Sequence, residues 1–226
     1  KVDNSPTNDY VLTAKSSADG GLTWAEASGG LSSDAQENLV AGTGAGSSLT
    51  SGGNKNVLLG VNAGNLIEGG DSNVAVGFES LKANTSGNFN TAVGAAASSI
   101  TTGMQNTCVG NSAGAGITTS SSNTYVGKDA GVSATGGSNV GVGSDAGKNL
   151  SGTNNTCIGF GAGDIGSFSG NNNTVIGNGA DPSAANVENE ITLGNDDITK
   201  FRVPGLNFSL KDTTATEDYV LTVDAN

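Results

Sequence analysis

The chain contains no histidine and is poor in aromatic residues, proline, cysteine and basic residues. Without histidine it has no Ser-His-Asp triad and no histidine metal cluster, so we expect neither an enzyme nor a cofactor. Nine basic against 21 acidic residues give a net charge of -12, which opposes binding to nucleic acid and to anionic membranes. No apolar run reaches the roughly 18 residues of a membrane helix, so membrane insertion is not expected either.

Glycine is abundant instead, with 37 residues, and many of these glycines mark a repeat. A phrase such as Asn90-Thr-Ala-Val-Gly94 recurs at intervals of 16 to 18 residues, and small residues commonly follow it, as in Gly110-Asn-Ser-Ala-Gly114. A period this short excludes helical repeats, which need more than about thirty residues, and propeller blades. The ten copies end at Gly42, Gly60, Gly77, Gly94, Gly110, Gly127, Gly143, Gly159, Gly177 and Gly194.

Each repeat predicts one coil of an all-β, parallel β-solenoid. The V-x-V segment before each glycine is typical of a short strand, and the bracketing Asn and Gly tolerate the left-handed backbone of tight turns. Coils stack at the spacing of neighbouring strands, about 4.8 Å, so ten coils would form a rod roughly 45 to 50 Å long. We assign this array to residues 36–200.

We assign side-chain direction within the strand from the position directly before each glycine, which holds Val, Ile or Leu in every copy but the first. We interpret this slot as the inner face of the solenoid. The predicted solenoid core is Leu59, Val76, Val93, Val109, Val126, Val142, Ile158, Ile176 and Leu193.

The middle slot of the strand should then face outward, yet it is also mostly apolar. A thin coil cannot cover its own outside, so we expect a further copy of the chain to bury this row, as in an oligomer built around a symmetry axis. The predicted subunit interface is Val40, Leu58, Ala75, Ala92, Cys108, Tyr125, Cys157 and Val175.

The two ends share a five-residue phrase, since Asp9–Thr13 returns as Asp218–Thr222. The first copy continues through an Asp-Gly-Gly turn into a second alternating run, which predicts a β-hairpin module over residues 1–35. Residues 201–226 would be an incomplete second module, which favours a segment of a longer fibre over coincidence of a short string.

Other motifs give weaker signals. Cys108 and Cys157 lie three coils apart, roughly 14 Å, which is too far for a disulfide. "GGDSNVAVG" at residues 69–77 resembles a calcium-binding nonapeptide but occurs once, and "GTGAG" at 42–46 lacks the lysine of a phosphate loop. The acidic residues near turns are interpreted as solvated groups rather than a glycosidase pair. They are Glu79, Asp129, Asp145, Asp196 and Asp197.

The repeat N-x-[VA]-[VI]-G resembles the left-handed β-roll in the heads of trimeric autotransporter adhesins. It is more similar to the "NTAVG" repeats of tail fibres and other appendages of tailed phages, and "NEITLGNDDITKFRVPG" at 189–205 is similar to the segment that closes such arrays. The resemblance covers roughly residues 38–200. It implies a left-handed roll and a parallel homotrimer.

The expected function is therefore a structural and adhesive segment of a virion tail fibre, assembled with other fibre proteins and able to meet a host glycan or protein. The alternative is the head of a trimeric adhesin on the bacterial surface. An ice-binding face is suggested by Thr91, Thr107, Thr124, Thr156 and Thr174, but Val or Ile in the same slot indicates core. A capsule-degrading enzyme is the least favoured hypothesis.

Overall fold

The computed structural model describes residues 10–14, 22–26 and 33–200, and these residues contain strands but no helix. Accordingly, they include no helix of the length and apolarity that a membrane crossing requires. Strands β1 (Tyr10–Ala14) and β2 (Leu22–Glu26) pair antiparallel with each other, whereas the turn predicted between them lies outside the described residues. The predicted C-terminal module at 201–226 lies outside the described residues.

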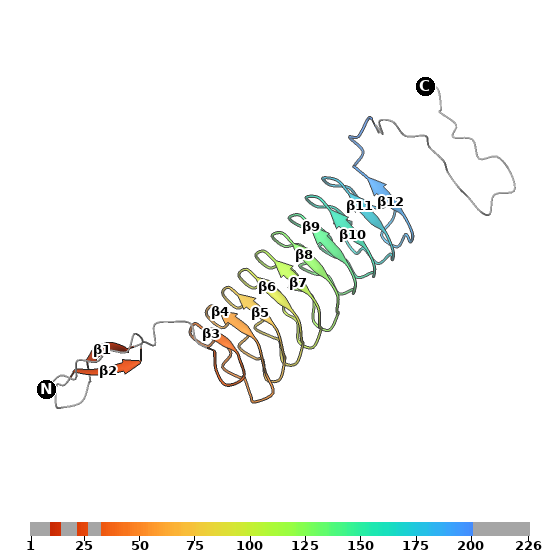
Figure 1. Cartoon of the computed structure of the whole chain (residues 1–226). Coiled ribbons are helices and arrows are strands. Elements are labelled where there is room, and N and C mark those ends of the chain that lie inside the picture. Colours follow the sequence, from red (N-terminus) through yellow and green to blue (C-terminus); the bar gives the residue numbers. More distant parts are fainter. Residues whose placement is uncertain (1–9, 15–21, 27–32, 201–226) are drawn as a thin grey trace, which may run out of the picture.

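The other ten strands form one parallel sheet along the side of a rod (Figure 1). Each strand pairs with its neighbours in sequence, so the chain completes one coil between successive strands and the predicted parallel β-solenoid is confirmed. The strands are β3 (Leu39–Ala41), β4 (Val57–Leu59), β5 (Val74–Val76), β6 (Thr91–Val93), β7 (Thr107–Val109), β8 (Thr124–Val126), β9 (Val140–Val142), β10 (Thr156–Ile158), β11 (Thr174–Ile176) and β12 (Ile191–Leu193).

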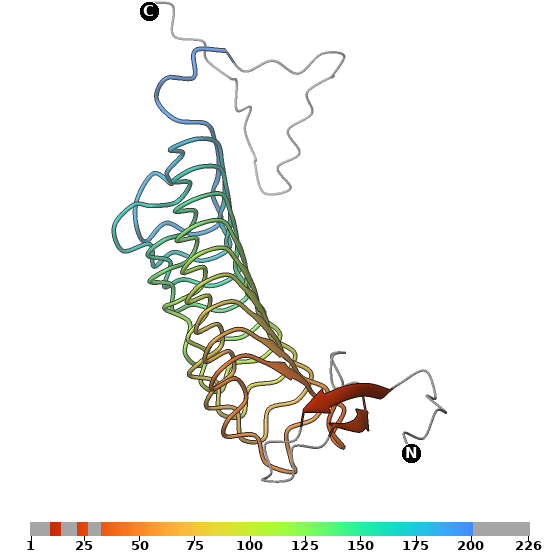
Figure 2. The same cartoon turned by 90° about the vertical axis from the view of Figure 1, so that its left-hand side faces the viewer.

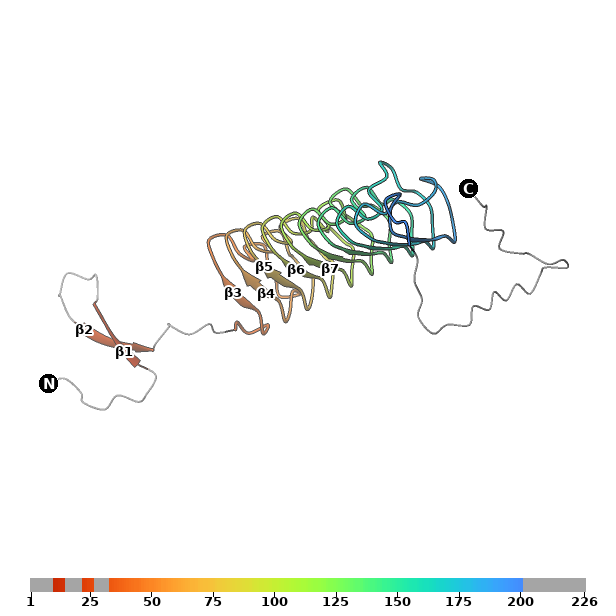
Figure 3. The ribbon, with the colours of Figure 1, turned by 90° about the horizontal axis from the view of Figure 1, so that it is seen from above.

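The remainder of each coil consists of turns that return the chain from the end of one strand to the start of the next. Figures 2 and 3 show these turns stacked along the rod, with the strands on one side of it. Equivalent residues face each other across every pair of strands, as Thr107 faces Thr124 between β7 and β8. The sheet side of the rod is therefore regular, and differences in coil length are taken up by the turns.

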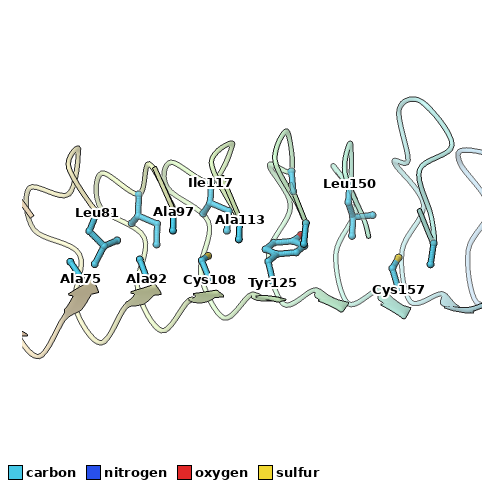
Figure 4. Packing of buried hydrophobic residues seen from close by; sticks show 14 of the residues in the cluster. Ala75, Leu81, Ala92, Ala97, Cys108, Ala113, Ile117, Tyr125, Leu150 and Cys157 are labelled. Atoms are coloured by element: carbon cyan, nitrogen blue, oxygen red, sulfur yellow. The ribbon is translucent and has the colours of Figure 1, made fainter. Parts of the chain in front are cut away.

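The core lies between the sheet and the turns on the opposite wall. Middle residues of the strands, such as Ala75 and Cys108, project toward residues of the turns, such as Leu81 and Ile117 (Figure 4). All of these side chains are 0% exposed and belong to one continuous hydrophobic cluster. Each coil therefore buries a single strand residue against its own turns.

This arrangement reverses the predicted side-chain directions, because the middle slot is the inner one. The residues assigned to a subunit interface are inside the single chain, where all are 0% exposed except Val40, which is half-buried at the first strand. They are Val40, Leu58, Ala75, Ala92, Cys108, Tyr125, Cys157 and Val175.

The residues assigned to the solenoid core are partly exposed instead and point away from it. In a strand, neighbouring side chains alternate between faces, so one wrong assignment reverses the whole set. These residues are Leu59, Val76, Val93, Val109, Val126, Val142, Ile158, Ile176 and Leu193.

A ladder of buried asparagines joins the coils just before each strand. The side-chain oxygen of each asparagine accepts the backbone N–H of the equivalent residue one coil later, at 2.8 to 3.0 Å. Asp34 precedes the ladder and accepts the N–H of Asn38, whereas Glu190 follows it and donates its N–H to Asn173. The members are Asn38, Asn56, Asn73, Asn90, Asn106, Asn123, Asn139, Asn155 and Asn173.

A column of glycines follows the strands because the coils approach each other too closely for a side chain. At Gly110 the backbone has a φ of 138°, and an added Cβ would lie 2.4 Å from the carbonyl oxygen of Gly127. Both the conformation and the contact exclude L side chains at this position. The recurring glycine of the sequence motif is thus explained by backbone stacking.

We predict that Asn106→Leu destabilises the array by about 3 to 5 kcal/mol, because leucine fills the space but accepts no hydrogen bond. The change would leave the N–H and side-chain amide of Asn123 and the carbonyl of Ser120 without their bonds to residue 106. Urea unfolding measures the effect. The control is Asn111→Leu at an exposed turn, where we expect a change within about 0.5 kcal/mol.

We make a second stability prediction for the glycines that follow the strands. Gly110→Ala should cost about 3 kcal/mol or more, since the chain must move to relieve the contact with Gly127. Gly69→Ala should be neutral or stabilising by up to about 1 kcal/mol, because nothing lies within 4 Å of its added Cβ. Equal melting temperatures for the two variants would contradict the close stacking.

Candidate functional site

The candidate functional site is the outward face of the sheet, formed by the first and third residues of each strand. The third residues are the apolar row named above. The first residues are partly exposed from β4 to β11 and more exposed at β12. They are Val57, Val74, Thr91, Thr107, Thr124, Val140, Thr156, Thr174 and Ile191.

Exposure on this face increases toward the C-terminal end of the array. Val142, Ile158 and Ile176 are 37 to 39% exposed, and Leu193 and Ile191 reach 49% and 72%. No outward residue of β4 to β12 is charged, although the chain carries 30 charged residues. An uncharged apolar stripe along a whole rod is larger than soluble monomers usually expose.

The threonines belong to this exposed face and not to the core. Each of the five lies first in its strand and is half-buried by its neighbours in the sheet. The Val and Ile residues at the same strand position also point outward. The prediction that this position belongs to the core was therefore wrong. The sequence signal that was missed is the small volume of many middle-slot residues, which suits the narrow interior of the coil.

Tyr125, which the sequence analysis placed at a subunit interface, lies within the core of the single chain (Figure 4). Its ring occupies space that glycines leave open. Cβ atoms added at Gly141 and Gly131 would lie 2.6 and 2.5 Å from it. Its hydroxyl is buried without a hydrogen-bond partner among the described residues, and burial raises its pKa above the usual value for tyrosine.

The two cysteines are buried and free, in agreement with the predicted lack of a disulfide. Burial raises the pKa of Cys108 to about 12, and burial likewise raises the pKa of Cys157 to about 12. A thiol in this environment is protonated at neutral pH and is a weak nucleophile. Both residues therefore act as small core side chains.

The acidic residues at the turns are largely paired with lysines. Glu79 contacts Lys82 at 2.7 Å, and Asp129 contacts Lys128 at 2.6 Å. Asp145 lies 3.1 Å from Lys148, whose hydrogen bond lowers the pKa of the carboxyl. Such partly exposed pairs contribute little to stability and do not resemble a catalytic pair of carboxylates.

Asp196 and Asp197 lie at the other end of the rod, in a hollow of about 590 Å³ that Asp181 also lines. Burial raises the pKa of Asp181, and the nearby Asp164 adds to the effect. Within residues 33–200, however, no three acidic or cysteine side chains come together as metal ligands. The outward face of the sheet remains the most extensive candidate surface.

Comparisons with protein-family models, with curated proteins and with solved structures found no match to this chain.

The buried hydroxyl of Tyr125 provides a test of the corrected core. Tyr125→Phe should stabilise the chain by about 1 kcal/mol, since it removes a polar group that has no partner. Tyr125→Ala should instead cost about 3 to 5 kcal/mol through the cavity it leaves. Chemical denaturation distinguishes the two, and a Phe variant less stable than the parent would show that the hydroxyl is bonded.

Proposed function

We propose that the chain is a structural and adhesive segment of a fibre-like appendage, and that it assembles as a parallel homotrimer through the outward face of the sheet. The observation that carries this proposal is the uncharged outward face of β4 to β12, on which the third strand residues form an apolar row beside first residues that are Thr, Val or Ile. The setting we favour is a virion tail fibre, with a bacterial surface adhesin as the alternative. Genes adjacent to the coding sequence would distinguish these settings.

Charge distribution supports burial of this face. The paired charges of Glu79, Asp129 and Asp145 lie at turns, outside the strands. Three sheets could thus meet without bringing like charges together, although each chain has a net charge of -12. Burying a long apolar face against equivalent faces is the usual way in which closed symmetric assemblies remove such a surface from water.

The regularity of the sheet also supports a parallel assembly. Every strand has the same length of three residues and the same register from β3 to β12. Copies standing in the same direction would therefore present matching rows at every level of the rod. The resulting shaft would be stiff and suited to holding recognition surfaces away from a particle or cell, and no catalytic step enters this role.

The assembly can be tested by light scattering coupled to gel filtration. The parent chain should have the mass of a trimer, whereas Val109→Arg should be a folded monomer because it places three like charges in the interface. Asn111→Arg, at an exposed turn, is the matched control and should remain trimeric. A monomeric parent, or a trimeric Val109→Arg, would refute this interface.

Ice binding is a second candidate because five threonines lie on the exposed sheet face. A flat, regularly spaced face of threonine and valine could order water if it were left uncovered. This function requires a free sheet, so it competes with trimer formation. A monomeric parent that shows thermal hysteresis, lost in Val109→Arg, would favour ice binding over the fibre.

A further inference from the structure

A groove runs along the corner that precedes the strands in the first coils of the array. Its volume is about 530 Å³, it lies in the first coils of the solenoid, and none of the residues that line it belongs to a strand. Side chains from four successive coils line it, namely Gln36, Asn54, Lys55, Asp71, Ser72 and Phe89. The groove was not predicted from the sequence, because its residues are 17 or 18 positions apart.

Hydrogen bonds between the corners hold these residues in line. The N–H of Lys55 donates to the carbonyl of Gln36, and the N–H of Phe89 donates to the carbonyl of Asp71, both at 3.0 Å. Lys55, Ser72 and Phe89 therefore occupy the same slot in consecutive coils, about 4.8 Å apart. A ligand along the groove would meet one new side chain at each coil.

Phe89 is anomalous in this slot. Its φ is 57°, in the left-handed region that bulky residues avoid, and its side chain is 60% exposed. The equivalent residues of the other coils are polar, as with Gln105, Asn154 and Asn172. An aromatic ring that is both conformationally unfavourable and exposed to water is unfavourable for the fold, and such outliers are typical of functional sites.

Polar groups beside the ring have unused hydrogen-bonding capacity. Asp71 accepts both hydrogen bonds from Asn54 at Oδ1, which leaves Oδ2 without a hydrogen-bond partner among the described residues. The three ion pairs of residues 33–200 involve Lys82, Lys128 and Lys148, so Lys55 is not among them. The groove thus offers donors and acceptors next to an exposed aromatic face.

We propose that this groove binds a neutral oligosaccharide, with Phe89 stacking on one sugar ring and Lys55 and Asp71 hydrogen-bonding to hydroxyl groups. A single cation next to an acid does not favour a phosphate backbone, and only one large apolar side chain is available to anchor a peptide. A sugar chain has apolar ring faces, many hydroxyls and a linear repeat, which match the groove. The inference gives the proposed adhesive function a ligand class and a location.

The test uses the full chain on an array of neutral glucans, galactans, mannans, xylans and N-acetylglucosamine oligomers, followed by calorimetry with the oligosaccharide that binds. Phe89→Asn and Lys55→Gln should each weaken binding about tenfold or more. Both substitutions introduce residues that the repeat itself carries in this slot, at Asn172 and Gln105. Phe160→Asn is the matched control, because Phe160 is 63% exposed but outside the groove.

Folding and assembly are measured on the same samples. Phe89→Asn should melt at the same or a higher temperature than the parent, since asparagine tolerates a positive φ, so lost binding cannot be attributed to unfolding. Binding to none of the oligosaccharides, or binding that survives Phe89→Asn, would overturn the proposal. A chain that is trimeric by light scattering yet fails to bind would refute the groove and leave the proposed assembly standing.

Discussion

The hydrogen bond between the buried asparagines of consecutive coils is the interaction on which the rest of the structure depends. Strands of three residues form few ladder bonds by themselves, so each coil also needs a fixed attachment at its corner. The oxygen of Asn90 accepts the N–H of Asn106, whose own oxygen accepts the N–H of Asn123. Because each bond joins equivalent positions, it fixes coil height and register together, and it satisfies polar groups that water cannot reach.

The close stacking that the ladder imposes also explains how the core accommodates variation. The interior is narrow, so a large residue in one coil requires a small neighbour, as Tyr125 requires Gly141. Elsewhere the opposite wall compensates, with Leu81 near the small Ala75 (Figure 4). The turns absorb the changes in coil length while the sheet remains constant. The constant face suits assembly with identical copies, whereas the variable corners can acquire individual binding properties.

Backbone strain follows the same division between constant and variable positions. The described residues include 18 non-glycine residues with positive φ, and many of them are Asn, Asp or Ser at corners. These types tolerate the left-handed region better than large side chains do. Phe89 breaks the pattern at the groove, and it does so on the exposed surface, where core packing cannot explain the choice. The local inconsistency between sequence and backbone is therefore informative about function.

The sequence by itself determined the period, the strands, the turn glycines and the absence of a disulfide, because each follows from spacing along the chain. It did not determine which way the strand faces. A three-residue strand has only two possible orientations, and both Val93 and Ala92 are apolar, so hydrophobic alternation carried no information. The tertiary structure decided the matter by placing the opposite wall of the coil against Ala92. It also brought Lys55, Asp71 and Phe89 into one groove. Residues one coil apart in the sequence become neighbours only when the coils stack.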